Sequence, residues 1–335
     1  MLKRVWTYCL VLAVGTGGCG LQWDPLYHEQ ITEEALRTVE VAALDEALTF
    51  ARFEHEGEPH VLGVTRYEDG TLEGVDLTLA LSAPDMDPIA LFGAHGFEPI
   101  REAVLAGSPQ VAVDVEALSM PVDLRARHVS AGTNFPEHAD EAGVVGGPYL
   151  FPSLKAPTGP YSSVEINEGL LDYEVELGWV TLAPVPEGTY PEHMGLILCN
   201  DYTNRDALLR HLDPSNVASG VGFTTGKSFP GYLPVGNLFV IPEDYRGFSE
   251  AVELQLYVNR SLRQRSKVDR AVWDIDAMFD ETWARRDVTW EHRGQRYPLY
   301  EGGVLEDRTM LMSGTPPGVV FNEVGAESRP QRCIT

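Results

Sequence analysis

The chain has 335 residues, and its 25 basic and 50 acidic side chains give a formal net charge of −25 at pH 7. A hydrophobic fraction of 44% and a charged fraction of 22% are those of a globular protein with one large domain or two ordinary ones. A surface with this much negative charge repels phosphate backbones and anionic lipid. We therefore expect no nucleic-acid partner. An anionic substrate would need a local positive centre, such as a bound cation beside one or two Lys or Arg side chains.

The first residues predict an export signal. Met1–Arg4 is a short basic segment, Val5–Val14 is apolar but too short to span a bilayer, and small residues then lead to Cys19. This arrangement resembles a bacterial lipobox, with Thr16 where leucine is usual. We therefore expect Cys19 to be lipidated and the protein to be exported, with this lipid as its only membrane anchor, facing the periplasm or cell surface. An ordinary cleaved signal and an uncleaved anchor are the alternatives.

Most of the predicted elements are short strands. Residues 20–40 favour a tether followed by a short helix. From Leu48, three apolar runs separated by Gly, Glu and Asp predict a small antiparallel meander, and a helix follows over about 88–105. The rest is mainly strand and loop, with one helix over 269–286 whose apolar stripe includes Val272.

This order of elements predicts an α+β fold, rich in β structure, with a small N-terminal β subdomain. The predicted segments are a lipoprotein-type signal peptide at 1–18, a tether and short helix at 19–42, the β subdomain at 43–120, a larger domain at 121–325 and a tail at 326–335.

An acidic alternation in the sequence LDYEVELGWV is the most informative local pattern. If it forms a strand, Asp172, Glu174 and Glu176 project from one face. Carboxylates spaced in this way repel one another unless the face is solvated or a cation lies between them. The pattern alone is compatible with either a metal site or a solvated acidic stripe.

A second acidic position follows the apolar run GLILC. Asp201 comes just after this predicted strand, where ligand sites commonly lie. Together with Glu174 and Glu176 it makes an all-oxygen set of ligands, which suits Mg²⁺, Mn²⁺ or Ca²⁺ and not a closed zinc site.

A histidine and a glutamate lie three residues apart in NFPEHADE. If the chain is helical after Pro136, His138 and Glu141 lie on the same side of that helix. The carboxylate can then orient the imidazole as a general base for water. A surface pair without a function is the alternative.

Two further segments offer groups that bind anions. Lys227 follows a glycine in GKSF, and SGTPPGV places Gly314 and Thr315 in a rigid loop whose backbone N–H groups and hydroxyl can hold an anion. A solvated turn residue and a plain turn are the alternatives.

Five segments, taken in order, resemble the signature segments of the fumarylacetoacetate-hydrolase superfamily: NFxxHxxE, YEVEL, NDYTNRD, GKSF and SGTPPGV. The resemblance covers roughly residues 121–322 and extends more loosely over 48–115. It implies that family's mixed β-sandwich or β-roll and a homodimer. It also implies residue roles: metal ligands Glu174, Glu176 and Asp201, a catalytic set His138, Glu141 and Lys227, and substrate-binding residues Arg205, Gly314 and Thr315.

The sequence departs from the family pattern at three positions. Ser153 stands where relatives often have a lysine, with Lys155 two residues further on. Leu208 falls where a glutamine is common, and Pro230 replaces an acidic residue. These departures place the usual reaction in question.

The resemblance implies a hydrolase that cleaves a C–C bond in a small anionic 1,3-dicarbonyl acid, similar to an acylpyruvate or fumarylacetoacetate. The implied cofactor is a divalent cation, Mg²⁺ first, with Mn²⁺ or Ca²⁺ as alternatives. Two other functions stay open. The same fold and metal can serve a decarboxylase, isomerase or hydratase, or the protein is a non-catalytic envelope lipoprotein that binds a metal or a small acid.

Overall fold

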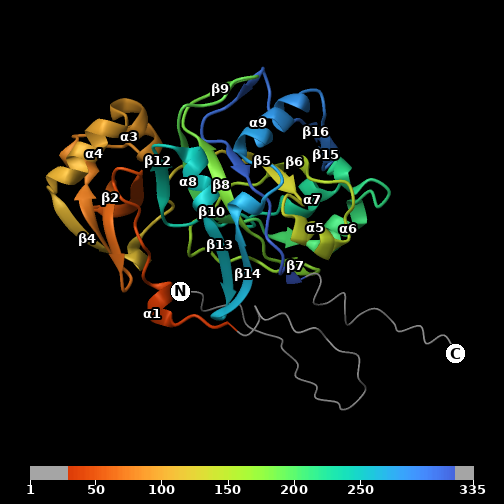
Figure 1. The fold of residues 1–335 in the computed structure, drawn as a ribbon, viewed down its shortest axis with the longest axis horizontal. Coiled ribbons are helices and arrows are strands. Elements are labelled where there is room, and N and C mark those ends of the chain that lie inside the picture. Colours follow the sequence, from red (N-terminus) through yellow and green to blue (C-terminus); the bar gives the residue numbers. More distant parts are fainter. Residues whose placement is uncertain (1–28, 321–335) are drawn as a thin grey trace, which may run out of the picture.

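A ten-stranded sheet runs through the computed structural model, which describes residues 29–320 (Figure 1). Its strand order is β4-β3-β2-β1-β12-β10-β8-β18-β5-β6. Neighbouring strands pair antiparallel except β18 and β5, which are parallel. Small two-stranded sheets and short helices surround it. This confirms the predicted β-rich α+β fold.

The elements fall into two groups along the chain. The first comprises α1 (Glu33–Leu36), β1 (Ala47–His55), β2 (Glu58–Glu68), β3 (Thr71–Asp76), α2 (Leu77–Ala80), α3 (Pro88–His95), α4 (Phe97–Ala106) and β4 (Gln110–Asp114). The second comprises β5 (Arg127–Gly132), α5 (Pro136–Ala142), β6 (Tyr149–Leu154), β7 (Leu171–Asp172), β8 (Val175–Thr181), β9 (Val185–Pro186), β10 (Met194–Asn200), β11 (Thr203–Asn204), α6 (Arg205–His211), α7 (Phe223–Lys227), β12 (Phe239–Pro242), α8 (Tyr245–Ala251), β13 (Glu253–Val258), β14 (Ser261–Lys267), α9 (Ile275–Ala284), β15 (Trp290–His292), β16 (Gln295–Tyr297), β17 (Val304–Leu305) and β18 (Met310–Met312).

The first group is an antiparallel meander, β1 to β4, covered by α3 and α4 on the left of Figure 1. The helices pack on it through buried side chains such as Ile89 and Ile100. The single helix predicted over 88–105 is wrong, because Gly96 separates two helices with a φ of 73°. Glycine adopts this left-handed conformation without a steric penalty. Asp87 then caps the first turn of α3 with its side chain.

The second group contains the centre of the sheet. Strand β8 lies between β10 and β18 and is buried along its whole length. Trp179 on β8 is fully packed, and its indole N–H donates to Ser249 Oγ at 2.8 Å, so the polar atom is satisfied inside the core. Because β1 pairs with β12, the sheet continues across the predicted boundary at residue 120. The predicted segment limits stay predictions.

The long helix predicted over 269–286 is shorter in the structure. Residues 268–270 form one 3₁₀ turn, and α9 begins only after Asp274, whose side chain accepts the N–H of Ala277. Val272 therefore does not belong to a helical stripe, and it is 53% exposed. A good N-cap residue defines the start of this helix more strongly than the apolar spacing upstream of it.

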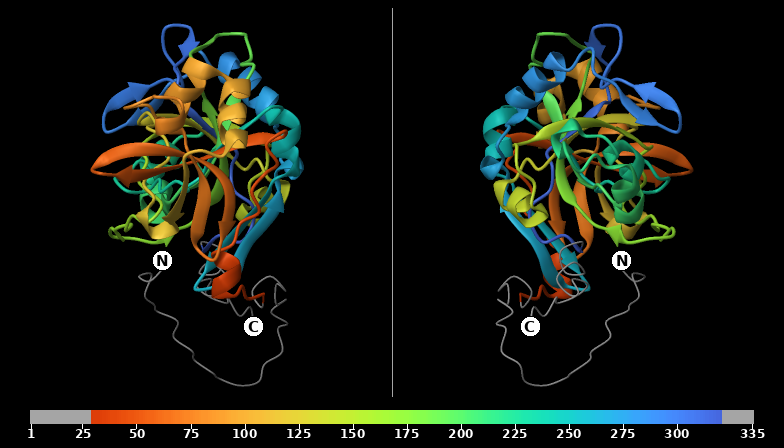
Figure 2. Two further views of the ribbon diagram at one scale, coloured as in Figure 1. Left: turned by 90° about the vertical axis from the view of Figure 1, so that its left-hand side faces the viewer. Right: turned by 90° about the vertical axis from the view of Figure 1, so that its right-hand side faces the viewer.

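The hairpin of β13 and β14 extends away from the sheet and lies beside α1, as both views in Figure 2 show. Backbone hydrogen bonds join the two segments, from Ile31 N–H to Arg260 O at 2.9 Å and from Leu262 N–H to Glu29 O at 3.0 Å. The predicted short helix near the N-terminus is therefore docked on the C-terminal half of the chain.

No helix among residues 29–320 is long and apolar enough to cross a membrane. The predicted signal peptide at 1–18, the lipidation site Cys19 and the tail at 326–335 lie outside the described residues.

Candidate metal centre

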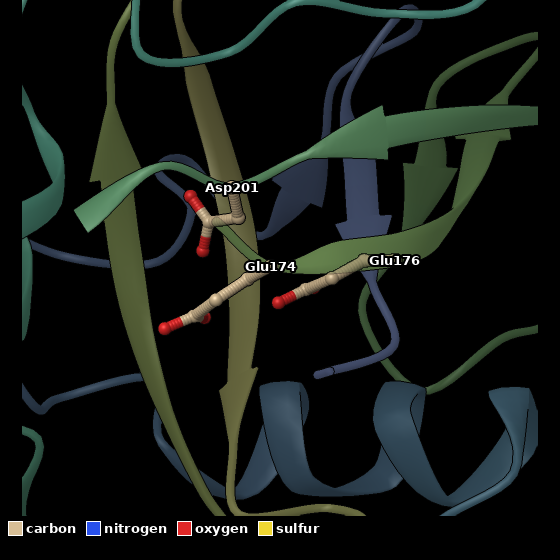
Figure 3. A group of neighbouring side chains, drawn as sticks. All are labelled: Glu174, Glu176 and Asp201. Atoms are coloured by element: carbon tan, nitrogen blue, oxygen red, sulfur yellow. The ribbon is translucent and has the colours of Figure 1, made fainter. Parts of the chain in front are cut away.

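Three buried carboxylates meet where β8 begins and β10 ends (Figure 3). Glu174, Glu176 and Asp201 each offer an oxygen within 4.8 Å of the others, and their exposed fractions are 4%, 1% and 0%. The antiparallel pairing of β8 with β10 brings them together, because Asn200 lies opposite Val175 at the point where one strand ends and the other begins. The Asp201 N–H donates to Glu174 O at 2.8 Å and fixes this crossing.

The predicted continuous acidic strand is interrupted between β7 and β8. β7 ends at Asp172 and β8 begins at Val175, so Asp172 and Glu176 belong to different strands and Glu174 lies between these strands. Asp172 Oδ2 accepts from Arg205 Nε at 2.7 Å. The strand predicted from the alternating acidic residues is therefore too long. The two residues between β7 and β8 keep the same spacing of acidic positions, so the sequence pattern does not show the break.

Two of the carboxylates are held by basic side chains. Lys227 Nζ donates to Glu174 Oε2 at 2.5 Å and to Asp201 Oδ2 at 2.7 Å, while Arg205 donates to Glu174 Oε1 at 2.7 Å. Burial lowers the pKa of Lys227, but the charges of Asp201 and Glu174 outweigh it and hold that pKa above its usual value. Lys227 is therefore an ammonium ion inside the site.

Lys155 is a residue of this site that the sequence reasoning missed. It is 3% exposed, and its Nζ donates to Asp201 Oδ1. The sequence signal was its place two residues after Ser153, where relatives carry a lysine. Burial lowers the pKa of Lys155, and the positive charge of Lys227 contributes to this shift.

Glu176 stands apart from the other two carboxylates. Among the described residues no basic side chain forms an ion pair with it, and its Oε2 accepts only the Gly314 N–H, at 3.0 Å. Burial raises the pKa of Glu176 well above its usual range, and the negative charges of Asp201 and Glu174 raise it further. A buried carboxylate in this position is stable only with a proton or a cation beside it.

These donors fit a divalent cation. An ionised carboxylate has about four lone-pair sites, whereas the side chain of Glu174 accepts three hydrogen bonds, that of Asp201 two and that of Glu176 one. With Asp172 included, four acidic groups face three basic ones, so the ionised cluster carries one excess negative charge. A divalent cation would turn this into a positive centre for an anionic substrate. Ligands that are all oxygen favour Mg²⁺, Mn²⁺ or Ca²⁺.

The predicted helix after Pro136 is α5, and it places His138 and Glu141 together. His138 Nδ1 lies 3.0 Å from Glu141 Oε2, and Glu141 also accepts the Gly318 N–H at 3.1 Å. A carboxylate at Nδ1 favours the tautomer that carries its proton there, which leaves Nε2 as the basic nitrogen. His138 also lies close enough to Glu174 to contribute to the lowering of the pKa of that carboxylate.

The SGTPPGV loop supports the carboxylates from the other side. Gly314 has a φ of 79°, and a Cβ there would lie 3.0 Å from Ala131 O, so the close approach of the loop requires glycine. Its N–H is bound to Glu176, and Thr315 Oγ1 donates to Val175 O at 3.0 Å. Their predicted contact with substrate stays a prediction.

A cavity of about 190 Å³ opens beside the carboxylates. His138, Glu174, Arg205, Lys227 and Thr315 line it. The structure therefore gathers residues from α5, α6, α7, the SGTPPGV loop and the position just before β8 around one space.

A family model describes this part of the chain. The model for the fumarylacetoacetate (FAA) hydrolase C-terminal domain matches residues 127–333. The chain belongs to the fumarylacetoacetate hydrolase family. No curated protein sequence matches it significantly.

Solved structures with the same fold include both hydrolases and isomerases of this family's type. A fumarylacetoacetate hydrolase from Exiguobacterium antarcticum is 24% identical, with 81% of this chain and 88% of that chain covered and a TM-score of 0.57. A probable 2-hydroxyhepta-2,4-diene-1,7-dioate isomerase from Mycobacterium abscessus is 20% identical, with 82% and 88% covered and a TM-score of 0.55. A 5-carboxymethyl-2-hydroxymuconate delta-isomerase from Mycobacterium smegmatis is 18% identical, with 81% and 90% covered and a TM-score of 0.52. Fold alone therefore leaves the reaction open.

Proposed function

We propose that this member of the fumarylacetoacetate hydrolase family is a divalent-metal-dependent hydrolase that cleaves a C–C bond in 1,3-dicarbonyl acids of the acylpyruvate type. The observation that carries the proposal is one cavity lined by both Glu174 of the carboxylate cluster and His138, whose ring lies against Glu141. A metal site beside a positioned general base is what hydrolysis of an acyl group needs.

Glu174, Glu176 and Asp201 would hold the cation, with Mg²⁺ as the first candidate and Mn²⁺ or Ca²⁺ as alternatives. When bound, the cation supplies a Lewis acid that orients and polarises the keto-acid end of the substrate. Arg205 and Lys227 keep Glu174 ionised and fixed in place, so the ligands are arranged before substrate arrives.

His138 is the proposed general base. Its Nε2 takes a proton from water, while Glu141 holds the ring through Nδ1 and stabilises the imidazolium that forms. The water oxygen bonds to the acyl carbonyl carbon, and the C–C bond to the keto-acid fragment then breaks. That fragment leaves with the electron pair as an enolate and recovers a proton from His138. Help of this kind contributes about 10²- to 10⁴-fold in rate.

Lys227 is the proposed electrostatic partner of the leaving enolate. Its ammonium group is buried, lines the cavity and already has two carboxylates to fix its position. A charge that is oriented in advance stabilises a developing anion without a reorganisation cost.

Isomerisation on the same site is the second candidate, because two of the solved structures with this fold are described as isomerases. An isomerase would use His138 to move a proton between carbon atoms and would release no shorter product. Product analysis therefore separates the two functions.

The test follows the enol absorbance of acylpyruvates, oxaloacetate and fumarylacetoacetate with Mg²⁺ or Mn²⁺ and then with EDTA, and identifies the products. We expect metal-dependent cleavage that Glu174→Gln abolishes and that Glu102→Gln, at an exposed position on α4, leaves intact. Folded, metal-loaded protein that leaves every compound unchanged would refute the hydrolase and favour a binding protein.

We also propose, from the sequence around Cys19 alone, that this enzyme is exported and held at the membrane by a lipid.

A further inference from the structure

The cavity beside the carboxylates extends along helix α6. Four α6 positions line it, Arg205, Leu208, Leu209 and the helix-end residue Leu212. They lie at i, i+3, i+4 and i+7, which is one face of an α-helix. Leu212 is roughly 10 Å along the axis from Arg205, at 1.5 Å per residue. The cavity therefore has a charged end at Arg205 and an apolar end at the leucines.

A second part of the lining, the aromatic wall, is mainly apolar. The rings of Tyr149 and Phe223 line the cavity and meet edge to face, with centroids 5.0 Å apart, and Val217 continues the wall. Leu208 is 4% exposed, so its side chain is buried. The α6 leucines, Phe223 and Val217 thus give this part of the cavity an apolar lining, and Tyr149 adds a phenol that lies close enough to Glu174 and Arg205 for their charges to act on it.

The lining residues with acidic or basic side chains all belong to the charged end of the cavity. They are His138, Glu174, Arg205 and Lys227, and the last two donate to the carboxylate of Glu174. None of the lining residues contributed by α6 beyond Arg205, or by the aromatic wall, is cationic. A second carboxylate on the far end of a substrate would be desolvated there without a cationic partner, which is costly.

The three departures from the family pattern are not equivalent in space. Leu208 lines the cavity, whereas neither Ser153 nor Pro230 does. Pro230 is exposed, and Ser153 is buried in β6. The departure at Leu208 thus bears directly on what the cavity accepts.

We propose that the site takes a 1,3-dicarbonyl acid whose acyl group is apolar, an alkyl chain or an aromatic ring, and rejects one whose acyl group ends in a second carboxylate, with Leu208 as the specificity-determining residue. This inference rests on the proposed function, since it assigns the keto-acid end to the carboxylate cluster. The whole cavity, with its charged end included, has a volume of about 190 Å³, so the acyl group occupies only part of this space. An apolar protein cavity of about 150 Å³ is enough for a benzene ring.

The test compares kcat/KM for acylpyruvates with acyl chains of two to eight carbons, for benzoylpyruvate, and for a six-carbon acyl chain that ends in either methyl or carboxylate. We expect a rise of about fourfold for each buried methylene until the cavity is filled. The carboxylate-ended chain is expected to be at least about a hundredfold poorer than its methyl-ended match. Equal or better turnover of the carboxylate-ended chain overturns the inference.

A pair of variants assigns the preference to the α6 wall. Leu208→Gln is expected to lower the six-carbon to two-carbon ratio of kcat/KM at least tenfold, because a buried amide replaces hydrocarbon. Leu105→Gln makes the same change on α4 at a position that is 67% exposed and does not line the cavity, and it leaves the ratio unchanged. An unaltered ratio in Leu208→Gln overturns the role of Leu208.

A binding measurement keeps this inference separate from the proposed function. Calorimetry of the metal-loaded protein with 2-oxo acids of increasing chain length requires no turnover. If no acylpyruvate is cleaved but affinity rises with chain length, the hydrolase is wrong and the apolar subsite stands. If short acylpyruvates are cleaved but neither turnover nor affinity rises with length, the hydrolase stands and the apolar subsite is wrong.

Discussion

The buried side chain of His128 makes the free energy of unfolding depend on pH. It lies on β5 with none of its surface exposed, and its Nδ1 accepts the Met310 N–H at 3.2 Å. Burial lowers the pKa of His128 to about 3, and the positive charge of Lys155 adds to the shift. The folded protein therefore keeps this imidazole neutral in a range of pH where the unfolded chain protonates it.

The size of the effect follows from the two pKa values. The difference between 6.5 in the unfolded chain and about 3 in the folded protein corresponds to about 5 kcal/mol, at about 1.36 kcal/mol per unit. Because the folded pKa is the lower one, this stability is fully present above pH 6.5 and is lost as the pH falls toward 3. By pH 5 the loss from His128 alone is about 2 kcal/mol.

His128→Asn removes the titration but keeps an oxygen that can accept the Met310 N–H. Urea unfolding at pH 7, 6 and 5 is expected to show the wild type losing about 2 kcal/mol more than the variant between pH 7 and 5. His55→Asn, at an exposed position on β1, serves as the matched control and should follow the wild type. The same dependence on pH in the wild type and His128→Asn would refute the reasoning. If His128→Asn does not fold, His128→Gln provides the same comparison.

Three further outcomes test the site and the predicted location. Because the pKa of Glu176 is raised, Mn²⁺ binding should release protons and tighten as pH rises. Glu176→Gln should reduce that release and weaken binding at least about a hundredfold. Calorimetry in two buffers measures both effects, and a wild type that releases no proton contradicts the argument. His138→Asn should lower kcat by about 10²- to 10⁴-fold while Mn²⁺ affinity is unchanged, and a variant that loses the metal as well would make His138 structural rather than a base. Cys19→Ser should move the protein out of the membrane fraction, and unchanged membrane association would show that the lipid anchor is wrong.

The sequence alone predicted the parts of the site that are encoded locally. His138 and Glu141 meet because they lie three residues apart on one short helix, and Glu174 and Glu176 lie two residues apart where β8 begins. Asp201 was predicted because it directly follows an apolar strand. Each of these inferences needs only residues that lie close together in the sequence, although spacing alone left a solvated acidic stripe and a surface pair as alternatives. The exported location and the residue roles carried over from the family stay predictions.

Other features depended on which distant segments pair in the sheet. Lys155 reaches Asp201 across 46 residues of sequence, and the N–H of Gly314 reaches Glu176 across 138. The break after Asp172 and the division of the helix at Gly96 depend on backbone conformations that hydrophobic spacing does not report.

The apolar end of the cavity was also decided only by the fold. Leu208 and Phe223 belong to different helices, α6 and α7, that meet around the charged cluster. Residue types and spacing thus predicted a group of carboxylates and a histidine–glutamate pair, and the structure places them around one cavity. The tertiary structure decided which charges balance that site and what kind of group its cavity accepts, because both depend on contacts between segments that are far apart in the sequence.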